Sequence, residues 1–370
     1  MTGFFQSIIT IVLFILILGA LVVIHELGHF VTARLSNVRV LEFGIGFPPR
    51  AKVLRNKGET LYSLNWLPIG GFVKLEGEDG TDADDPRSFS HQGLPKKLTI
   101  LVAGVLMNIL LAFVIFTGIA WLASPFVGVR FFEVQPGSPA AAAGLQPGEA
   151  IVAVDGQHYQ FIAGPNALIA LRERAGDTVV LTVAGTTGVQ RDVTVTLRSA
   201  DEINAQKGAL GISGATKPFE GYFFGAYTTN DLRTAIGIGV DQTVHWMGLI
   251  VGGLASLVSS VASNPTAAPP VSGPVGIATQ IGDIFWNSGP IMLLYVAGIL
   301  SANLAVVNIL PFPPLDGGRM LVIVLKAIPR YGRRISLRAE QLTYAVGFVA
   351  LFTFLIWITV FDIANQVGGT

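Results

Sequence analysis

Two histidines and a glutamate interrupt an apolar run near the N-terminus. In the stretch LVVIHELGHF, residues 21–30, His25 and His29 are four residues apart, and Glu26 follows the first histidine. On a helix, residues four apart share one face, so both imidazoles can bind one metal ion. Glu26 is placed to act on a water bound to that ion rather than to bind the ion. This HExxH pattern is a signature of zinc metalloproteases.

The cluster lies in a segment with the composition of a membrane span. Glu26 is the one formally charged side chain among residues 1–33. An ionisable group at the centre of a membrane helix costs about 2.5–3.5 kcal/mol on insertion scales, so such groups indicate function by default. The alternative is a pair of histidines that hydrogen-bond inside a helix bundle.

The composition predicts a multi-pass α-helical membrane protein. The chain has 370 residues, of which 51% are hydrophobic and 13% charged, against roughly a quarter charged in soluble domains. Zero net charge without a basic block excludes nucleic acid as an expected partner. The absence of cysteine excludes disulfides and Cys-ligated zinc. We expect four transmembrane helices, at residues 4–33, 98–122, 290–310 and 341–361.

Loop charges orient these helices. Residues 34–97 and 319–338 are rich in Lys and Arg, so the positive-inside rule predicts that both are cytoplasmic and both termini extracytoplasmic. HExxH then lies toward the cytoplasmic end of the first helix. Residues 243–263 are also apolar, but a single crossing there would put the second basic loop outside. We therefore expect an interfacial or re-entrant helix on the outer side.

Two regions alternate like β-strands. Residues 36–97 contain VRVLEFGIGF and GGFVKLEG and predict a membrane-associated β-loop on the cytoplasmic side. A small β-rich insert follows the second helix. The expected division is 1–35, the first helix; 36–97, the β-loop region; 98–122, the second helix; 127–215, the extracytoplasmic insert; 216–288, outer-side interfacial or re-entrant helices; 289–340, the third helix and a cytoplasmic segment; and 341–362, the fourth helix.

A catalytic zinc ion usually has a third protein ligand. The predicted topology puts His158 and His245 on the opposite side of the membrane, whereas His91 remains open. Asp316 is favoured because it follows the third helix on the cytoplasmic side. The prolines of NILPFPPLDGG, residues 308–318, cannot continue that helix. The resulting irregular backbone is tolerated at membrane depth only where it lines protein or a cavity.

These motifs together resemble the site-2 protease family of intramembrane zinc metalloproteases, in the bacterial branch typified by the regulator of sigma-E protease. The resemblance rests on HELGH, NILPFPPLDGG, GIGFPP, GPVGIA and AGVLMN, the last with Val105 where the family usually has Pro. PGSPAAAAGLQPGEAIVAVDGQ, residues 136–157, resembles a bacterial PDZ domain. The single PDZ-like insert differs from members that carry two in tandem.

The resemblance implies an intramembrane metalloendopeptidase that cuts transmembrane segments of single-span proteins after another protease has trimmed them. Anti-sigma factors and remnant signal peptides are examples, and the bacterial inner (plasma) membrane is the usual location. The PDZ-like insert would bind peptide ends or only shape access. The implied residues are Glu26 as catalytic base; His25, His29 and Asp316 as ligands of Zn²⁺; and Asn308, Asn108, Gly44, Gly46 and Gly71 around the substrate. Either asparagine could instead hold helices together.

Two other classes compete with this interpretation. A catalytically silent membrane scaffold built around the PDZ-like insert would be expected to lose Glu26 or a ligand, and this chain has all four residues. A metal transporter would need polar groups that continue toward the outer face, and the first helix has none above His25.

Overall fold

The computed structural model describes residues 2–56, 58–78, 85–161, 166–186, 188–204, 207–213, 222–264, 269, 271–332 and 335–368. The chain forms two compact units. The first consists of Met1–Ile115 and Trp246–Thr370, and the second of Phe116–His245. Residues 216–221 of the predicted outer-side segment lie outside the described residues.

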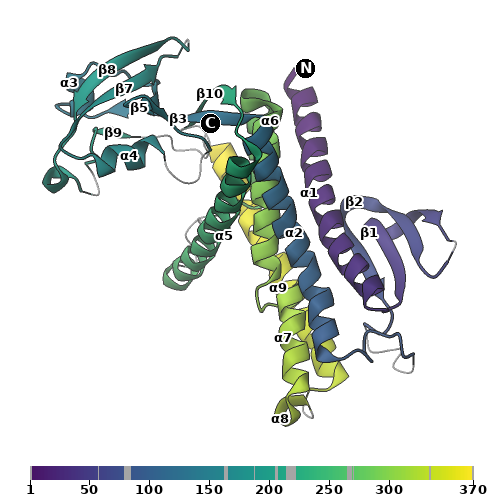
Figure 1. Cartoon of the computed structure of the whole chain (residues 1–370). Coiled ribbons are helices and arrows are strands. Elements are labelled where there is room, and N and C mark those ends of the chain that lie inside the picture. The colour runs from purple at the N-terminus through teal and green to yellow at the C-terminus, as the bar shows by residue number, and fades with distance from the viewer. Residues whose placement is uncertain are drawn as a thin grey trace. The chain divides into compact units, whose positions relative to one another are not determined.

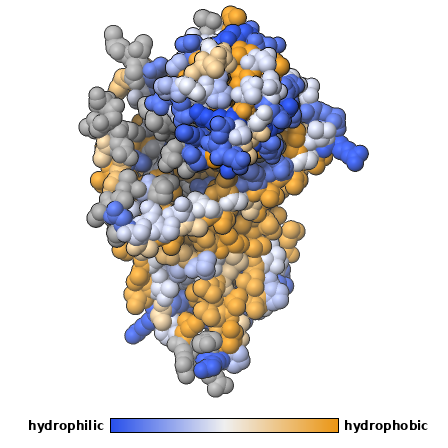
Figure 2. Space-filling model, turned by 90° about the vertical axis from the view of Figure 1, so that its left-hand side faces the viewer, coloured by the Kyte–Doolittle hydropathy of each residue, from blue (hydrophilic) through white to orange (hydrophobic). Residues whose placement is uncertain are grey.

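Long apolar helices dominate the chain (Figure 1). In the described residues, five helices are long and apolar enough to cross a membrane: α1, α2, α5, α6 and α9. Figure 2 shows hydrophobic side chains gathered over the helical part of the molecule. The helices are α1 (Thr2–Leu35), α2 (Leu94–Leu122), α5 (Leu232–Ser263), α6 (Pro274–Asn308), α7 (Asp316–Ala327), α8 (Pro329–Gly332) and α9 (Leu337–Gly368).

Two of these helices differ from the prediction. Helix α5 is one unbroken helix of 32 residues, so residues 243–263 contain no re-entrant turn, and five candidate spans stand against the four predicted. Helix α6 begins at Pro274 and bends at Gly289, whose φ is 81°. Pro290 follows, and a proline inside a helix removes a backbone hydrogen bond. The third predicted span is therefore the second half of a kinked helix.

Small residues bring α1 and α2 into close contact. A Cβ atom at Gly28 would lie 2.4 Å from the carbonyl oxygen of Ala103 and 2.7 Å from Cγ of Met107. Membrane helices commonly pack through such small residues because their backbones can then approach. This contact holds the HExxH turn of α1 against the middle of α2.

Strands β1 (Val40–Arg55) and β2 (Leu61–Leu75) form an antiparallel pair beside α1 (Figure 1). Ile45 pairs with both Gly71 and Leu64, so residues 40–45 lie between residues 61–64 and residues 71–75. The first residue of β1 and the last residue of β2 belong to a buried apolar cluster. Its members are Ala33, Val38, Val40, Leu75, Phe89, Ile100 and Leu101. The β-loop region is thereby anchored to α1 and α2.

The turn between α6 and α7 is also closely packed. A Cβ atom at Gly317 would lie 2.1 Å from the carbonyl oxygen of Ile309, and one at Gly318 would lie 2.5 Å from the carbonyl carbon of Phe312. Gly347 of α9 approaches Pro313 equally closely. These three glycines leave room for the turn that presents Asp316.

The second unit is a β-rich body around its own apolar core, which includes Phe131, Ile151, Leu171 and Leu181. Its main sheet has the strand order β10–β3–β5–β7–β8, with β6 paired to β5. The elements are β3 (Ser124–Arg130), β4 (Glu133–Val134), α3 (Pro139–Ala142), β5 (Ala150–Val154), β6 (Gln157–His158), α4 (Ala167–Glu173), β7 (Thr178–Ala184), β8 (Gln190–Thr196), a 3₁₀ turn (Ala200–Glu202), β9 (Ile212–Ser213) and β10 (Tyr222–Thr228).

Strand β10 lies outside the range predicted for the β-rich insert. Residues 222–228 fall in the range expected to hold outer-side helices, yet they pair with β3 as an edge strand. Their sequence, YFFGAYT, is rich in aromatic residues, which favour strands over helices. The body therefore continues beyond the predicted boundary at residue 215.

The α1–α2 contact gives a prediction with a defined sign. We expect Gly28→Ala to lower the free energy of unfolding by about 1–3 kcal/mol, because the added methyl overpacks the helix contact. Gly118→Ala in α2 is the matched control, since the described part of the chain leaves open space around its Cβ position, and it should be neutral or stabilising. Unfolding midpoints of the detergent-solubilised proteins test this. Equal midpoints for the two variants would contradict the close contact.

Candidate metal centre

Three side chains from two distant parts of the chain converge on one point. His25 and His29 come from adjacent turns of α1, and Asp316 is the first residue of α7. One ligand atom from each lies within 4.8 Å of the others. The two histidines are 6% and 7% exposed, so the cluster is nearly closed to solvent.

The distances fit a tetrahedral metal site. Nε2 of His25 lies 3.0 Å from Oδ2 of Asp316, and Nε2 of His29 lies 3.2 Å from the same oxygen. The two Nε2 atoms are 3.2 Å apart. Zinc bonds of about 2.0–2.1 Å at tetrahedral angles separate neighbouring ligand atoms by about 3.3 Å. The triangle therefore matches three corners of such a site and leaves the fourth for water or substrate.

The proton positions also favour a cation at this point. Nδ1 of His29 donates to the carbonyl oxygen of Ile100 at 2.8 Å. In the neutral imidazole, Nε2 is then an unprotonated acceptor. It faces a carboxylate oxygen, which can only accept. Two acceptors this close need a proton or a metal ion between them, and the donor set of two imidazoles and a carboxylate suits zinc.

The groups around the start of α7 determine the charge state of the Asp316 carboxylate. Burial alone would raise the pKa of Asp316, but its hydrogen bonds to His25 and His29 hold that pKa below its usual value. One turn further along α7, Arg319 forms an ion pair with Glu78, which follows β2. The pKa of Arg319 is raised because of this negative neighbour. The carboxylate of Asp316 is thus ionised and ready to bind a cation.

Glu26 lies between the histidines and the sheet. It is half-buried on α1, and a Cβ atom at Gly71 would be 3.7 Å from its Cγ. The segment of residues 71–75 therefore begins beside the glutamate. In the described register these residues pair with residues 40–45 on one side, so they form an edge of the sheet.

The remaining predicted residues are divided between the sheet and the helices. Gly44 lies opposite Phe72, and a Cβ atom there would be 2.3 Å from the ring of Phe72. Gly46 has φ of 79°, a conformation that glycine adopts without strain. Asn308 ends α6 and is half-buried. Asn108 is fully buried and contacts His25.

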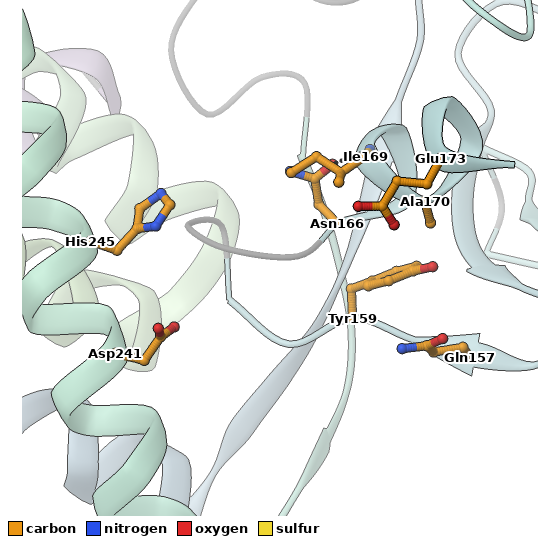
Figure 3. A pocket seen from close by; sticks show the side chains of 8 residues that line it. All are labelled: Gln157, Tyr159, Asn166, Ile169, Ala170, Glu173, Asp241 and His245. Atoms are coloured by element: carbon orange, nitrogen blue, oxygen red, sulfur yellow. Dashed lines mark hydrogen bonds between the residues drawn. The ribbon is translucent and has the colours of Figure 1, made fainter. Parts of the chain in front are cut away.

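The other histidines take no part in the cluster. Within the described ranges, His25, His29 and Asp316 form the one group of three potential ligands. His91 is exposed on its loop. His158 hydrogen-bonds to the carbonyl oxygen of Val152. His245 faces a cavity of about 410 Å³ in the second unit, across from Tyr159 and Glu173 (Figure 3).

Gly104 was not among the site residues predicted from the sequence. A Cβ atom at this position of α2 would lie 2.4 Å from Nε2 of His29 and 2.8 Å from Cε1 of His25. Only glycine leaves room for both imidazoles beside α2. Its place next to Ala103 in an apolar helix, where paired small residues indicate a close helix contact, was the available signal.

Removal of the carboxylate tests the composition of the cluster. We expect Asp316→Asn to weaken zinc binding by more than the roughly 10- to 100-fold that loss of an outer partner costs, because a charged ligand is lost. His91→Ala should bind zinc like the wild type. Competition with a chromophoric chelator measures both affinities. A large loss in His91→Ala with none in Asp316→Asn would assign the third ligand to the loop.

The chain is similar to known zinc metalloproteases over nearly its whole length. A protein of Clostridium acetobutylicum named "Putative zinc metalloprotease CA_C1796" is 32% identical over 98% of this chain and 100% of its own length. The zinc metalloprotease RasP of Geobacillus kaustophilus is 27% identical over 97% of this chain and 98% of its own length. Residues 13–354 match peptidase family M50. With a match over most of its length, the chain belongs to peptidase family M50.

Proposed function

We propose that this chain is an intramembrane zinc metalloendopeptidase that cuts the transmembrane segments of single-span membrane proteins. The observation that carries this proposal is the buried triangle of two imidazoles and a carboxylate. One side of the triangle lies in α1, a helix long and apolar enough to cross a membrane. A peptidase needs its zinc at that depth only if the bond it cuts is there too.

His25, His29 and Asp316 would hold the zinc ion. When bound, zinc lowers the pKa of its water toward 7 and polarises the carbonyl of the bond to be cut. Asp316 holds its negative charge at the cluster, as its lowered pKa requires. The burial of the two histidines keeps bulk water from these groups.

Glu26 would be the general base and later the general acid. It takes a proton from the attacking water and returns it to the amine of the leaving fragment. A group with this task needs to reach both the water and the peptide nitrogen. Its half-buried position between the imidazoles and residue 71 supports this role.

The edge at residues 71–75 would hold the substrate in an extended form. A transmembrane helix cannot be cut while wound, because its carbonyls are hydrogen-bonded within the helix. An exposed strand edge offers backbone groups with which an unwound segment can pair. Gly44, Gly46 and Gly71 have no side chains to fill the space around this part of the sheet. Gly71 lets the edge lie beside Glu26. Asn308, at the end of α6, would hold the substrate backbone or its carbonyl.

The second unit would control which substrates enter. Its strands and short helices follow the segments that resemble a PDZ domain. A PDZ domain pairs extended peptide ends with a strand, so this unit would bind newly exposed ends or exclude untrimmed ectodomains. The substrates would then be proteins already trimmed by another protease, such as anti-sigma factors or remnant signal peptides.

The proposed arrangement in the membrane follows from the charges of the loops. The positive-inside rule favours a cytoplasmic location for residues 34–97 and 319–338. With four crossings, both termini are outside the inner membrane and the metal centre lies toward the cytoplasm. Helix α5 would then lie along the outer surface, although it is long enough to cross.

Replacement of the base tests the proposal. We expect Glu26→Gln to lose cleavage of a tagged single-span substrate by about 10²–10⁴-fold, the usual contribution of a general base, while zinc remains bound. Glu59→Gln is the control, because Glu59 is an exposed glutamate in surface ion pairs, which contribute little. Equal cleavage by Glu26→Gln and wild type would contradict the proposed role. Cleavage by neither would favour the silent scaffold.

The strand edge gives a separate prediction. Proline removes one backbone donor, so we compare single prolines at residues 71, 73 and 75 with prolines at residues 72 and 74. The set whose N–H groups point away from residues 40–45 should reduce cleavage roughly 2- to 10-fold per lost hydrogen bond, with zinc content unchanged. Unchanged cleavage in both sets would rule out pairing at this edge.

A further inference from the structure

Asn108 has a fully buried polar side chain beside the metal centre. It lies on α2 and is 0% exposed. Its Nδ2 atom is 3.3 Å from Nδ1 of His25. In the described residues, its Oδ1 atom is buried without a hydrogen-bond partner. A buried acceptor without a donor costs about 1–3 kcal/mol, so this orientation of the amide needs an explanation.

The imidazole of His25 supplies the missing donor. Its Nε2 atom belongs to the cluster with His29 and Asp316. An imidazole that binds a cation through Nε2 carries its proton on Nδ1, and that N–H group needs an acceptor. The oxygen and nitrogen of an asparagine amide are assigned from their hydrogen bonds. A rotation of the amide by 180° gives the Nδ1–H group and Oδ1 to each other.

Resting on the proposed function, we propose that Asn108 is a positioning residue that accepts a hydrogen bond from His25 and fixes its tautomer and ring orientation. The carbonyl oxygen of Ile100 does the same for His29. Helix α2 therefore orients both imidazoles of α1, each through one acceptor. The two acceptors are eight residues apart on α2, about two turns, whereas the two histidines are one turn apart on α1.

Asn108 is itself held in place by another helix. The hydroxyl of Ser301, on α6, donates to the backbone carbonyl oxygen of Asn108 at 2.8 Å. Both residues are 0% exposed. A substrate would have to displace this packing to reach the amide. The structure thus favours a position behind the metal ligand over the contact with substrate that the family resemblance suggested.

The test measures zinc affinity of the full-length protein by chelator competition, together with the absorption spectrum of the Co²⁺-loaded protein. Asn108→Asp keeps an acceptor of the same shape, and Asn108→Leu removes it at similar volume. Ser301→Ala is the packing control, since it removes the α6 contact and leaves the amide. Unfolding midpoints of the metal-free proteins check the fold, and Asn108→Ala replaces the leucine variant if that variant does not fold.

We expect Asn108→Leu to bind zinc about 10- to 100-fold more weakly, as outer partners of metal ligands typically do when lost, with a changed Co²⁺ spectrum. Asn108→Asp should bind at least as tightly as wild type, and Ser301→Ala within about twofold, because the acceptor persists in both. Wild-type affinity in Asn108→Leu, or equal losses in the Asp and Leu variants, would overturn the positioning role.

A variant of the ligand itself separates this proposal from the function on which it rests. His25→Ala should lose zinc. If it does while Asn108→Leu does not, only the positioning role fails and the metal centre stands. If His25→Ala retains zinc at wild-type affinity, the metal centre itself fails. Reduced cleavage by Asn108→Leu with unchanged zinc affinity would instead assign Asn108 to the substrate.

Discussion

Three acceptor atoms that lie together in a nearly buried cluster constrain the rest of this structure. Two imidazole nitrogens and a carboxylate oxygen lie 3.0–3.2 Å apart, and the two imidazoles belong to a helix built mainly from apolar residues. Burial of such groups is costly unless a partner satisfies them. A shared metal ion would satisfy all three and would leave a fourth position for chemistry. The protein then has to hold parts of α1 and α7, 291 residues apart in the chain, in one fixed arrangement.

Small residues make that arrangement possible. Gly28 lets α1 touch α2, Gly104 leaves space for the imidazoles, and Gly317 lets α7 turn back on the end of α6. Membrane helices associate by close packing rather than by the hydrophobic effect, because lipid is as apolar as their own side chains. The polar acceptors of α2 then orient rings that belong to α1. Packing and ligand orientation are thus two consequences of the same helix contact.

More of the candidate metal centre than of the surrounding fold could be predicted from the sequence. HExxH specifies two ligands by local helix geometry, and the prolines before Asp316 indicate a break that could present a third. The strands at residues 36–76 follow from alternation and glycine spacing. In contrast, the unbroken α5 depends on packing that apolar composition does not reveal, and β10 depends on pairing with a strand more than ninety positions earlier. Asn108 was predicted to be a site residue, but its hydrogen-bond partner depends on the distance between two helices.

Zinc K-edge X-ray absorption of the purified protein shows whether the two histidines bind the metal ion. We expect scattering from two imidazoles and from oxygen ligands at about 2.0–2.2 Å, with loss of one imidazole contribution in His25→Ala. Sulfur scattering is not expected, because the chain has no cysteine. A coordination shell of oxygen alone, or one unchanged in His25→Ala, would contradict a metal centre built on the HExxH turn.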